Sequence, residues 1–281
     1  MMRAIGVMKD TYLFSDIHPL GIQVFPPLQQ ATQWYELIDR AELDTLQGRN
    51  LSFEETFIRI YLNIADRGGT MVVRPWNHLD FVAVPFLPSP TYTLDTNEAL
   101  EKHFEIVQTF MTRHPIGQWS DYINDTVVGQ HIGPREFLRG YRKYVEIASE
   151  HSWFRIEDFH LDPDAMLRRI CDDLEMDFDP GYVDSWFMNA NVTGDPATRT
   201  ISSRLFETFE PAPPAYLSED DIDEIRGNAD YKAIIEILAY DDIYPTTDID
   251  PRAVTGLPYA DEDQTDITTE IVERPPPPPT E

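Results

Sequence analysis

The sequence has little cysteine and no long hydrophobic run. Cys171 is the only cysteine, so no disulfide can form within the chain, and a single thiol fits a reducing compartment. No stretch reaches the roughly 20 apolar residues that a membrane-spanning helix needs. The N-terminal MMRAIGVMKDTYLF lacks the apolar core and small-residue cleavage site of a signal peptide. These absences predict a cytoplasmic protein without a membrane span.

Positive charge is also scarce. The formal net charge is −28, and residues 215–281 carry 18 Asp and Glu against 4 Lys and Arg. A chain this acidic repels nucleic acids and anionic lipid headgroups, so we expect neither as a partner. The acidic C-terminal segment leaves open a protein partner that binds there.

Several catalytic signatures are missing as well. The sequence has no HExxH, no CxxC and no GxSxG, and its histidines are too scattered to form a ligand cluster. We therefore expect no metal site. Cys171 falls on the apolar face of a predicted helix, which favours a place in the core.

What the sequence does contain is an alternation of strand-like and helical segments. Strands are expected at Tyr12–Ile17, Thr70–Arg74, Phe104–Thr112 and Trp153–Ile156. Helices are expected within Leu28–Leu46, after Ser52, over Pro134–Glu150 and over Asp162–Leu174. This alternation predicts an α/β fold, a three-layer parallel sheet with helices on both faces. Ligands of such folds bind at the carboxyl ends of the strands.

The composition changes after Phe209. FEPAPPAY reads as a proline-rich linker, Ser218–Tyr240 is compatible with one helix, and VERPPPPPTE is typical of an extended tail. We therefore divide the chain into an α/β domain, residues 1–210, and an acidic, proline-rich extension, residues 211–281, that is partly disordered.

The segment WFRIEDFHLDPDAMLRRICDDLEMDFDP, from Trp153 to Pro180, resembles a segment near the end of many sulfotransferases. The positions that match the family pattern are Arg155, Glu157, Asp158, Asp162, Pro163, Leu167, Leu174, Phe178 and Pro180. Ile156 stands where Tyr is usual, and Glu175 where Gly is usual. The resemblance implies a P-loop-type fold that moves a sulfuryl group from 3′-phosphoadenosine 5′-phosphosulfate to a hydroxyl of a small-molecule or carbohydrate acceptor. It also implies that Glu157 and Asp158 are structural.

A second segment, RHPIGQWSDY, resembles the element with which this family binds the 3′-phosphate. The resemblance implies that Arg113 and Ser120 bind that phosphate, because a guanidinium fork and a hydroxyl near a helix start are good phosphate donors. The family places Ser eight residues after Arg, whereas here Asp121 occupies that position. The alternative is an arginine that caps a helix or pairs with a surface carboxylate.

A third segment, VVRPWNHLDF, places His78 just past a strand end. That position resembles the base that activates the acceptor in cytosolic sulfotransferases, and a neutral imidazole suits this task. Asp80 is a candidate to orient His78, and His18, at the end of another strand, is a competing base. A purely structural histidine stays open as the alternative.

A late segment, NANVTGDPATRTISSR, resembles the loop that closes over the nucleotide in some family members. The resemblance implies that Arg199 and Arg204 bind the nucleotide. The alternative is a turn followed by two solvated arginines.

The resemblance covers Tyr12 to Arg204, and one family element is missing from it. Tyr12–Ile17 corresponds to the second strand of the family, and only MMRAIGVMKDT precedes it, without the Gly-rich loop that wraps the 5′-phosphosulfate. We therefore expect a sheet without its first strand and a crippled or absent activity. Three interpretations stay open: a sulfotransferase, an inactive or truncated binding protein of the same ancestry, and an unrelated α/β domain.

Overall fold

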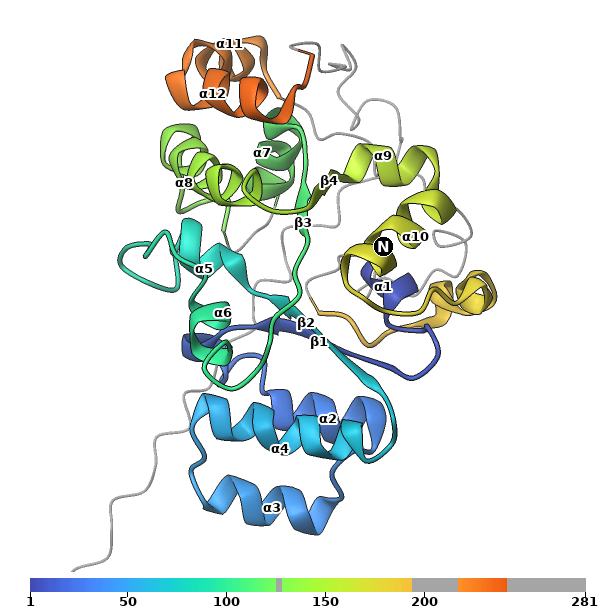
Figure 1. Cartoon of the computed structure of the whole chain (residues 1–281). Coiled ribbons are helices and arrows are strands. Elements are labelled where there is room, and N and C mark those ends of the chain that lie inside the picture. The colour runs from blue at the N-terminus through green and yellow to red at the C-terminus, as the bar shows by residue number, and fades with distance from the viewer. Residues whose placement is uncertain (125–127, 194–216, 242–281) are drawn as a thin grey trace, which may run out of the picture. The chain divides into compact units, whose positions relative to one another are not determined.

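The computed structural model describes residues 1–124, 128–193 and 217–241 (Figure 1). Its strands are β1 (Thr11–Ile17), β2 (Thr70–Pro75), β3 (Phe110–Thr112) and β4 (Trp153–Arg155). Its helices are α1 (Met2–Ile5), α2 (Pro27–Tyr35), α3 (Arg40–Gly48), α4 (Phe53–Ala65), α5 (Asn77–Phe81), α6 (Asp95–Leu100), α7 (Pro115–Asn124), α8 (Pro134–Ala148), α9 (Ile156–Leu161), α10 (Pro163–Asp173), α11 (Glu219–Gly227) and α12 (Ala229–Leu238). Short 3-10 turns lie at Pro19–Gly21, Pro180–Asp184 and Trp186–Met188. In these described ranges, no helix is both long and apolar enough to cross a membrane.

The four strands form two separate parallel pairs. β1 pairs with β2 from Thr11↔Thr70 to Ile17↔Pro75, and β3 pairs with β4 from Phe110↔Trp153 to Thr112↔Arg155. The α/β character and the parallel pairing agree with the prediction. A single continuous sheet is not what the described residues form, because none of their strands joins the two pairs. The missing first strand stays a prediction.

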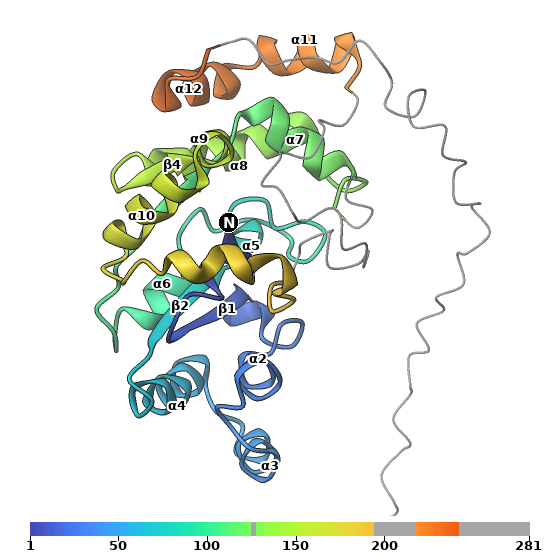
Figure 2. The same cartoon turned by 90° about the vertical axis from the view of Figure 1, so that its right-hand side faces the viewer.

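Helices α2 and α4 pack on the same side of the β1–β2 pair (Figure 2). Phe14 of β1 shares a buried cluster with Ala31 of α2 and with Phe57 and Ile60 of α4. Phe57, Ile60 and Ile64 are spaced three and four residues apart, which places them on one face of α4. This apolar layer holds the two strands whose ends carry the candidate site.

Side chains from α2 close the edge of β1 that faces away from β2. The Tyr35 hydroxyl accepts from the Leu13 N–H (2.9 Å) and donates to the Leu13 carbonyl (2.7 Å). The Gln30 amide does the same for Ser15, at 2.9 and 2.8 Å. Burial raises the pKa of Tyr35 to about 12, so the hydroxyl keeps its proton. Backbone groups that would otherwise need another strand are satisfied by these two side chains.

Replacing Gln30 with alanine is expected to lower the free energy of unfolding by about 1–3 kcal/mol, because the Ser15 N–H and C=O lose their partners in a buried place. Chemical denaturation measures the change. Gln29→Ala, one residue earlier on an exposed position of the same helix, is the control and should shift stability by no more than about 0.5 kcal/mol. Equal effects of the two substitutions would show that the contact between Gln30 and the Ser15 backbone does not contribute to stability.

Two tyrosines of α8 hold the outer edge of β3 in a similar way. The Tyr141 hydroxyl accepts from the Arg113 N–H (2.8 Å) and donates to the Arg113 carbonyl (2.5 Å). The Tyr144 hydroxyl donates to the Met111 carbonyl (2.9 Å). Burial raises the pKa of both hydroxyls, so both stay protonated. The backbone of Arg113 is thereby fixed at the end of β3.

The helices after residue 217 pack onto this part of the chain. Ile222, Ile225, Tyr231 and Ile234 share a buried cluster with Leu138 of α8. The one helix predicted over Ser218–Tyr240 is wrong: α11 ends at Gly227, and the Asn228 side chain accepts from the Asp230 N–H to begin α12. Glycine often ends a helix and asparagine often caps one, so the residues Gly227 and Asn228 themselves explain the break between α11 and α12. The chain divides into units at Thr246, and the second lies outside the described residues. The predicted boundary at residue 210 stays a prediction.

Candidate functional site at the strand ends

The carboxyl ends of β1 and β2 lie side by side, since the strands are parallel and Ile17 aligns with Pro75. His18 follows β1 directly, and α5, which begins at Asn77, follows β2. The Thr96 hydroxyl donates to the Ile17 carbonyl (3.0 Å) and docks the start of α6 on the same edge. Three segments far apart in the sequence therefore meet at one place.

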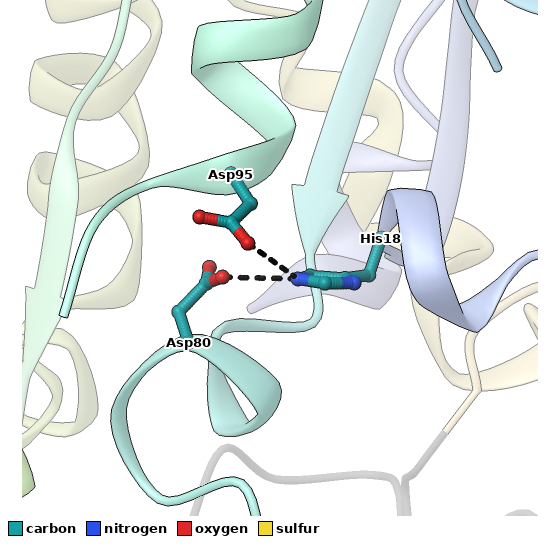
Figure 3. A group of neighbouring side chains, drawn as sticks. All are labelled: His18, Asp80 and Asp95. Carbon is teal, nitrogen blue, oxygen red and sulfur yellow. Dashed lines mark hydrogen bonds and ion pairs between the residues drawn. The ribbon is translucent and has the colours of Figure 1, made fainter. Parts of the chain in front are cut away.

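His18, Asp80 and Asp95 converge at this edge (Figure 3). His18 Nε2 lies 2.9 Å from Asp80 Oδ1 and 3.9 Å from Asp95 Oδ2. The side chains of His18 and Asp80 are 1% and 0% exposed, while that of Asp95 is 24% exposed. Burial raises the pKa of Asp80, and the hydrogen bond from His18 partly offsets this. Asp80, expected to orient His78, contacts His18 instead.

The hydrogen bonds of His18 fix its tautomer. Nδ1 accepts from the Leu20 N–H (3.0 Å), which can only donate, so the ring proton of neutral His18 lies on Nε2 and goes to Asp80. Both nitrogens are thus committed. His18 has no lone pair to offer an acceptor hydroxyl, which makes it a poor general base.

His78 has the opposite arrangement. Its Nε2 lies 2.7 Å from the Val84 carbonyl, which only accepts, so Nε2 carries the proton in the neutral ring. Nδ1 is then the basic nitrogen, and it lies 3.2 Å from the Tyr122 hydroxyl. The Tyr122 ring stacks on His78 at 5.5 Å between centroids. Of the two candidate bases, His78 is the one that keeps its basic nitrogen next to an exchangeable hydroxyl.

Arg113 is held at the end of β3 with its side chain turned to α7. Its guanidinium forms an ion pair with the Asp121 carboxylate. Burial raises the pKa of Asp121, and Arg113 opposes that rise by favouring the charged carboxylate. Ser120 is completely buried in α7. Asp121, which stands at the position where the family has serine, is therefore the residue that pairs with Arg113.

The same turn of α7 contacts both predicted site residues. Asp121 pairs with Arg113, and the next residue, Tyr122, contacts His78. His78 and Arg113 follow different strand pairs, and α7 contacts both of them.

No family model and no curated protein matches the chain. Two solved structures do. The "Sulfotransferase Domain from the Curacin Biosynthetic Pathway" aligns with a TM-score of 0.57 and 17% identity, over 85% of this chain and 93% of that chain. The "Sulfotransferase Domain from the Synechococcus PCC 7002 Olefin Synthase" aligns with a TM-score of 0.53 and 18% identity, over 85% and 90%. The chain has the sulfotransferase fold.

Within this sulfotransferase fold, a fourth segment reaches the strand ends at Thr193. The Thr193 N–H donates to Ser15 Oγ (3.2 Å), and its hydroxyl donates to Asp16 Oδ2 (2.6 Å). Arg74 forms an ion pair with Asp16 and donates to the Thr193 carbonyl (2.9 Å). The first part of the predicted closing segment is thus anchored beside β1 and β2. Arg199 and Arg204 themselves lie outside the described residues.

Sequence reasoning missed Asp95, Tyr122 and the Asp16–Arg74 pair. Tyr122 had a weak signal, because it falls in the segment that also contains Arg113. Asp95 had none, since only the folded chain brings it next to His18. Asp16 lies within a predicted strand, and its left-handed backbone (φ 56°) cannot be read from the sequence.

Proposed function

We propose that the chain is a sulfotransferase-type protein that moves a sulfuryl group from 3′-phosphoadenosine 5′-phosphosulfate to a hydroxyl of a small-molecule or carbohydrate acceptor in the cytoplasm. The observation that supports this best is the link through α7 between His78 and Arg113, which lie past two strand ends of a sulfotransferase fold. No step requires a metal ion.

Arg113 is the group proposed to bind the 3′-phosphate. Its guanidinium already holds an anion, the Asp121 carboxylate, so its position and charge fit an anionic ligand. A phosphate dianion carries more charge than a half-exposed carboxylate and can displace it. Arg199 and Arg204 are proposed to add positive charge from the segment that follows Thr193.

His78 is the proposed general base. The acceptor oxygen attacks sulfur, the bond from sulfur to the phosphate oxygen breaks, and the hydroxyl proton passes to His78 Nδ1, directly or through the Tyr122 hydroxyl. The Val84 carbonyl favours the resulting imidazolium, because it accepts from Nε2 at 2.7 Å. The leaving group departs as 3′-phosphoadenosine 5′-phosphate.

The test is transfer of radiolabelled sulfate from the donor to a panel of hydroxyl acceptors. His78→Asn is expected to lower kcat by roughly 10²–10⁴-fold with little change in KM for the donor, because proton transfer and not donor binding is lost. His103→Asn, an exposed histidine after α6, is the control and should transfer at the wild-type rate. A His78→Asn protein as fast as wild type would remove His78 from the mechanism.

The second candidate is a non-catalytic binding protein of the same fold. The observation that favours it is Asp121 on the guanidinium of Arg113, where it competes with phosphate. In this reading, a protein partner binds the acidic segment 211–281, most of which lies outside the described residues.

Asp121→Asn separates the two candidates. Removing the competing charge is expected to tighten binding of 3′-phosphoadenosine 5′-phosphate by roughly 3–10-fold, about 1 kcal/mol, which calorimetry can measure. If the wild-type protein binds the nucleotide and transfers sulfate, the ligand displaces Asp121 from Arg113 and the enzyme candidate is favoured. If only the Asp121→Asn protein binds, the pair blocks the site and the non-catalytic candidate is favoured.

A further inference from the structure

Asp80 and Asp95, the two carboxylates beside His18, each use one oxygen to accept hydrogen bonds from other side chains. Asp80 Oδ1 accepts from His18 Nε2 at 2.9 Å. Asp95 Oδ1 accepts from the hydroxyls of Thr91 (3.1 Å) and Thr93 (2.5 Å). The second oxygen of each carboxylate is therefore left for another ligand.

Asp80 Oδ2 is the atom that needs a partner. It is buried and makes no hydrogen bond within the described part of the chain. The backbone amide of Asp95 also favours the charged form of Asp80, but it forms no hydrogen bond of ordinary geometry with Oδ2. A buried carboxylate oxygen without a partner, next to a second carboxylate, is costly unless a proton or a metal cation joins it.

The geometry of the cluster suits a single cation. One oxygen from each of Asp80 and Asp95 and one ring nitrogen of His18 lie within 4.8 Å of one another, so the two carboxylates are close enough to share one cation. Figure 3 shows both carboxyl groups directed at the same edge of the His18 ring. The opening is on the Asp95 side, since that side chain is 24% exposed whereas Asp80 is fully enclosed. A cation would enter there and keep water on that side.

The tautomer of His18 decides the kind of cation. A metal on Nε2 would force the proton onto Nδ1, which faces the Leu20 N–H at 3.0 Å, and the two donors would oppose each other. His18 instead orients the carboxylate through its Nε2–H, as residues around metal ligands commonly do. The ligands are then carboxylate oxygens alone, which hard divalent cations prefer and zinc does not.

We propose that Asp80 and Asp95 bind one hard divalent cation of the Mg²⁺, Mn²⁺ or Ca²⁺ class at the carboxyl ends of β1 and β2, with His18 orienting the Asp80 carboxylate. The site is independent of the nucleotide site proposed at Arg113. It places positive charge at the edge of a strongly acidic protein where the strands end.

The test titrates Mn²⁺ into the full chain and follows the loss of the free Mn²⁺ signal by electron paramagnetic resonance. Wild type is expected to bind one Mn²⁺ saturably, displaced by Mg²⁺ or Ca²⁺, and Asp95→Asn to weaken this at least tenfold. Asp44→Asn, an exposed carboxylate of α3 paired with Arg40, controls for weak surface binding and should match wild type. Circular dichroism checks that each variant is folded.

His18→Ala adds a second readout. An orienting residue lost from around a metal site typically costs 10–100-fold in affinity, so binding should weaken and not vanish. Absence of saturable Mn²⁺ binding by folded wild type, equal affinity in Asp95→Asn, or a preference for Zn²⁺ over Mn²⁺ would each overturn the proposal.

Discussion

Replacing Arg113 with alanine is expected to weaken binding of 3′-phosphoadenosine 5′-phosphate by roughly 30-fold or more, because a charge-assisted guanidinium–phosphate contact contributes about 2 kcal/mol. The fold should survive the change. The Arg113 backbone is held by Tyr141, and the side chain meets a half-exposed carboxylate whose loss of a partner is tolerable. Calorimetric titration of both proteins gives the ratio of dissociation constants.

Arg40→Ala provides the matched control for charge. Arg40 is an exposed arginine of α3 in an ion pair with Asp44, so its removal changes net charge by the same amount. The dissociation constant of the Arg40→Ala protein for 3′-phosphoadenosine 5′-phosphate should equal that of wild type within about twofold at 0.15 M salt. At this salt concentration, interactions between exposed charges more than about 8 Å apart are screened. If Arg40→Ala and Arg113→Ala weaken binding alike, Arg113 is not a specific phosphate ligand.

Gly140→Ala is the substitution with the largest expected effect on stability. A Cβ at Gly140 of α8 would overlap the carbonyl oxygen of Phe81 at the end of α5. The obstacle is backbone, so α5 and α8 must separate. We expect a loss of about 3 kcal/mol or more in the free energy of unfolding, and a Tm lower by roughly 6–12 °C for a chain of this size. Differential scanning calorimetry measures both.

Gly48→Ala is the control for this prediction. A Cβ at Gly48, the last residue of α3, meets nothing within 4 Å. Alanine there should leave stability unchanged or raise it by about 0.5–1 kcal/mol, because glycine is the poorer helix former. A Gly140→Ala protein as stable as Gly48→Ala would mean that α5 and α8 are not in such close contact. The consequence reaches the site, since α5 carries His78.

Helix starts were predictable from the sequence because their chemistry is local. Helices were predicted after Ser52 and from Asp162, and in the structure Ser52 forms a capping box with Glu55 while Asp162 caps α10 with Pro163 in the first turn. The helix predicted within Leu28–Leu46 was less accurate. It is two helices, α2 and α3, separated where Glu36 adopts a left-handed backbone (φ 51°). A non-glycine residue gives no sequence signal for such a break.

Strand lengths were harder to predict because pairing is not local. Phe104–Thr112 has the apolar and β-branched composition of a strand, yet only Phe110–Thr112 is one, since its partner β4 offers three residues. β1 extends over Thr11–Ile17, close to the predicted Tyr12–Ile17. Composition predicts that a segment can form a strand. The length of the neighbouring strand decides how many of its residues do so.

The site was predictable only in part for the same reason. Ends of parallel strands point to His78, Arg113 and His18 from the sequence alone. Their partners come from elsewhere: Asp80 and Asp95 at His18, Asp121 at Arg113, Tyr122 at His78. These contacts decide which histidine can act as a base, and the spacing of residues in the sequence does not predict them.

We propose that Arg113 of this sulfotransferase-type fold binds 3′-phosphoadenosine 5′-phosphate. Calorimetric titration of the folded wild-type chain with 3′-phosphoadenosine 5′-phosphate tests it most directly. The proposal predicts one site with micromolar affinity, roughly −8 kcal/mol, that competes with the phosphosulfate donor. No heat of binding from a protein that circular dichroism shows to be folded would contradict the claim.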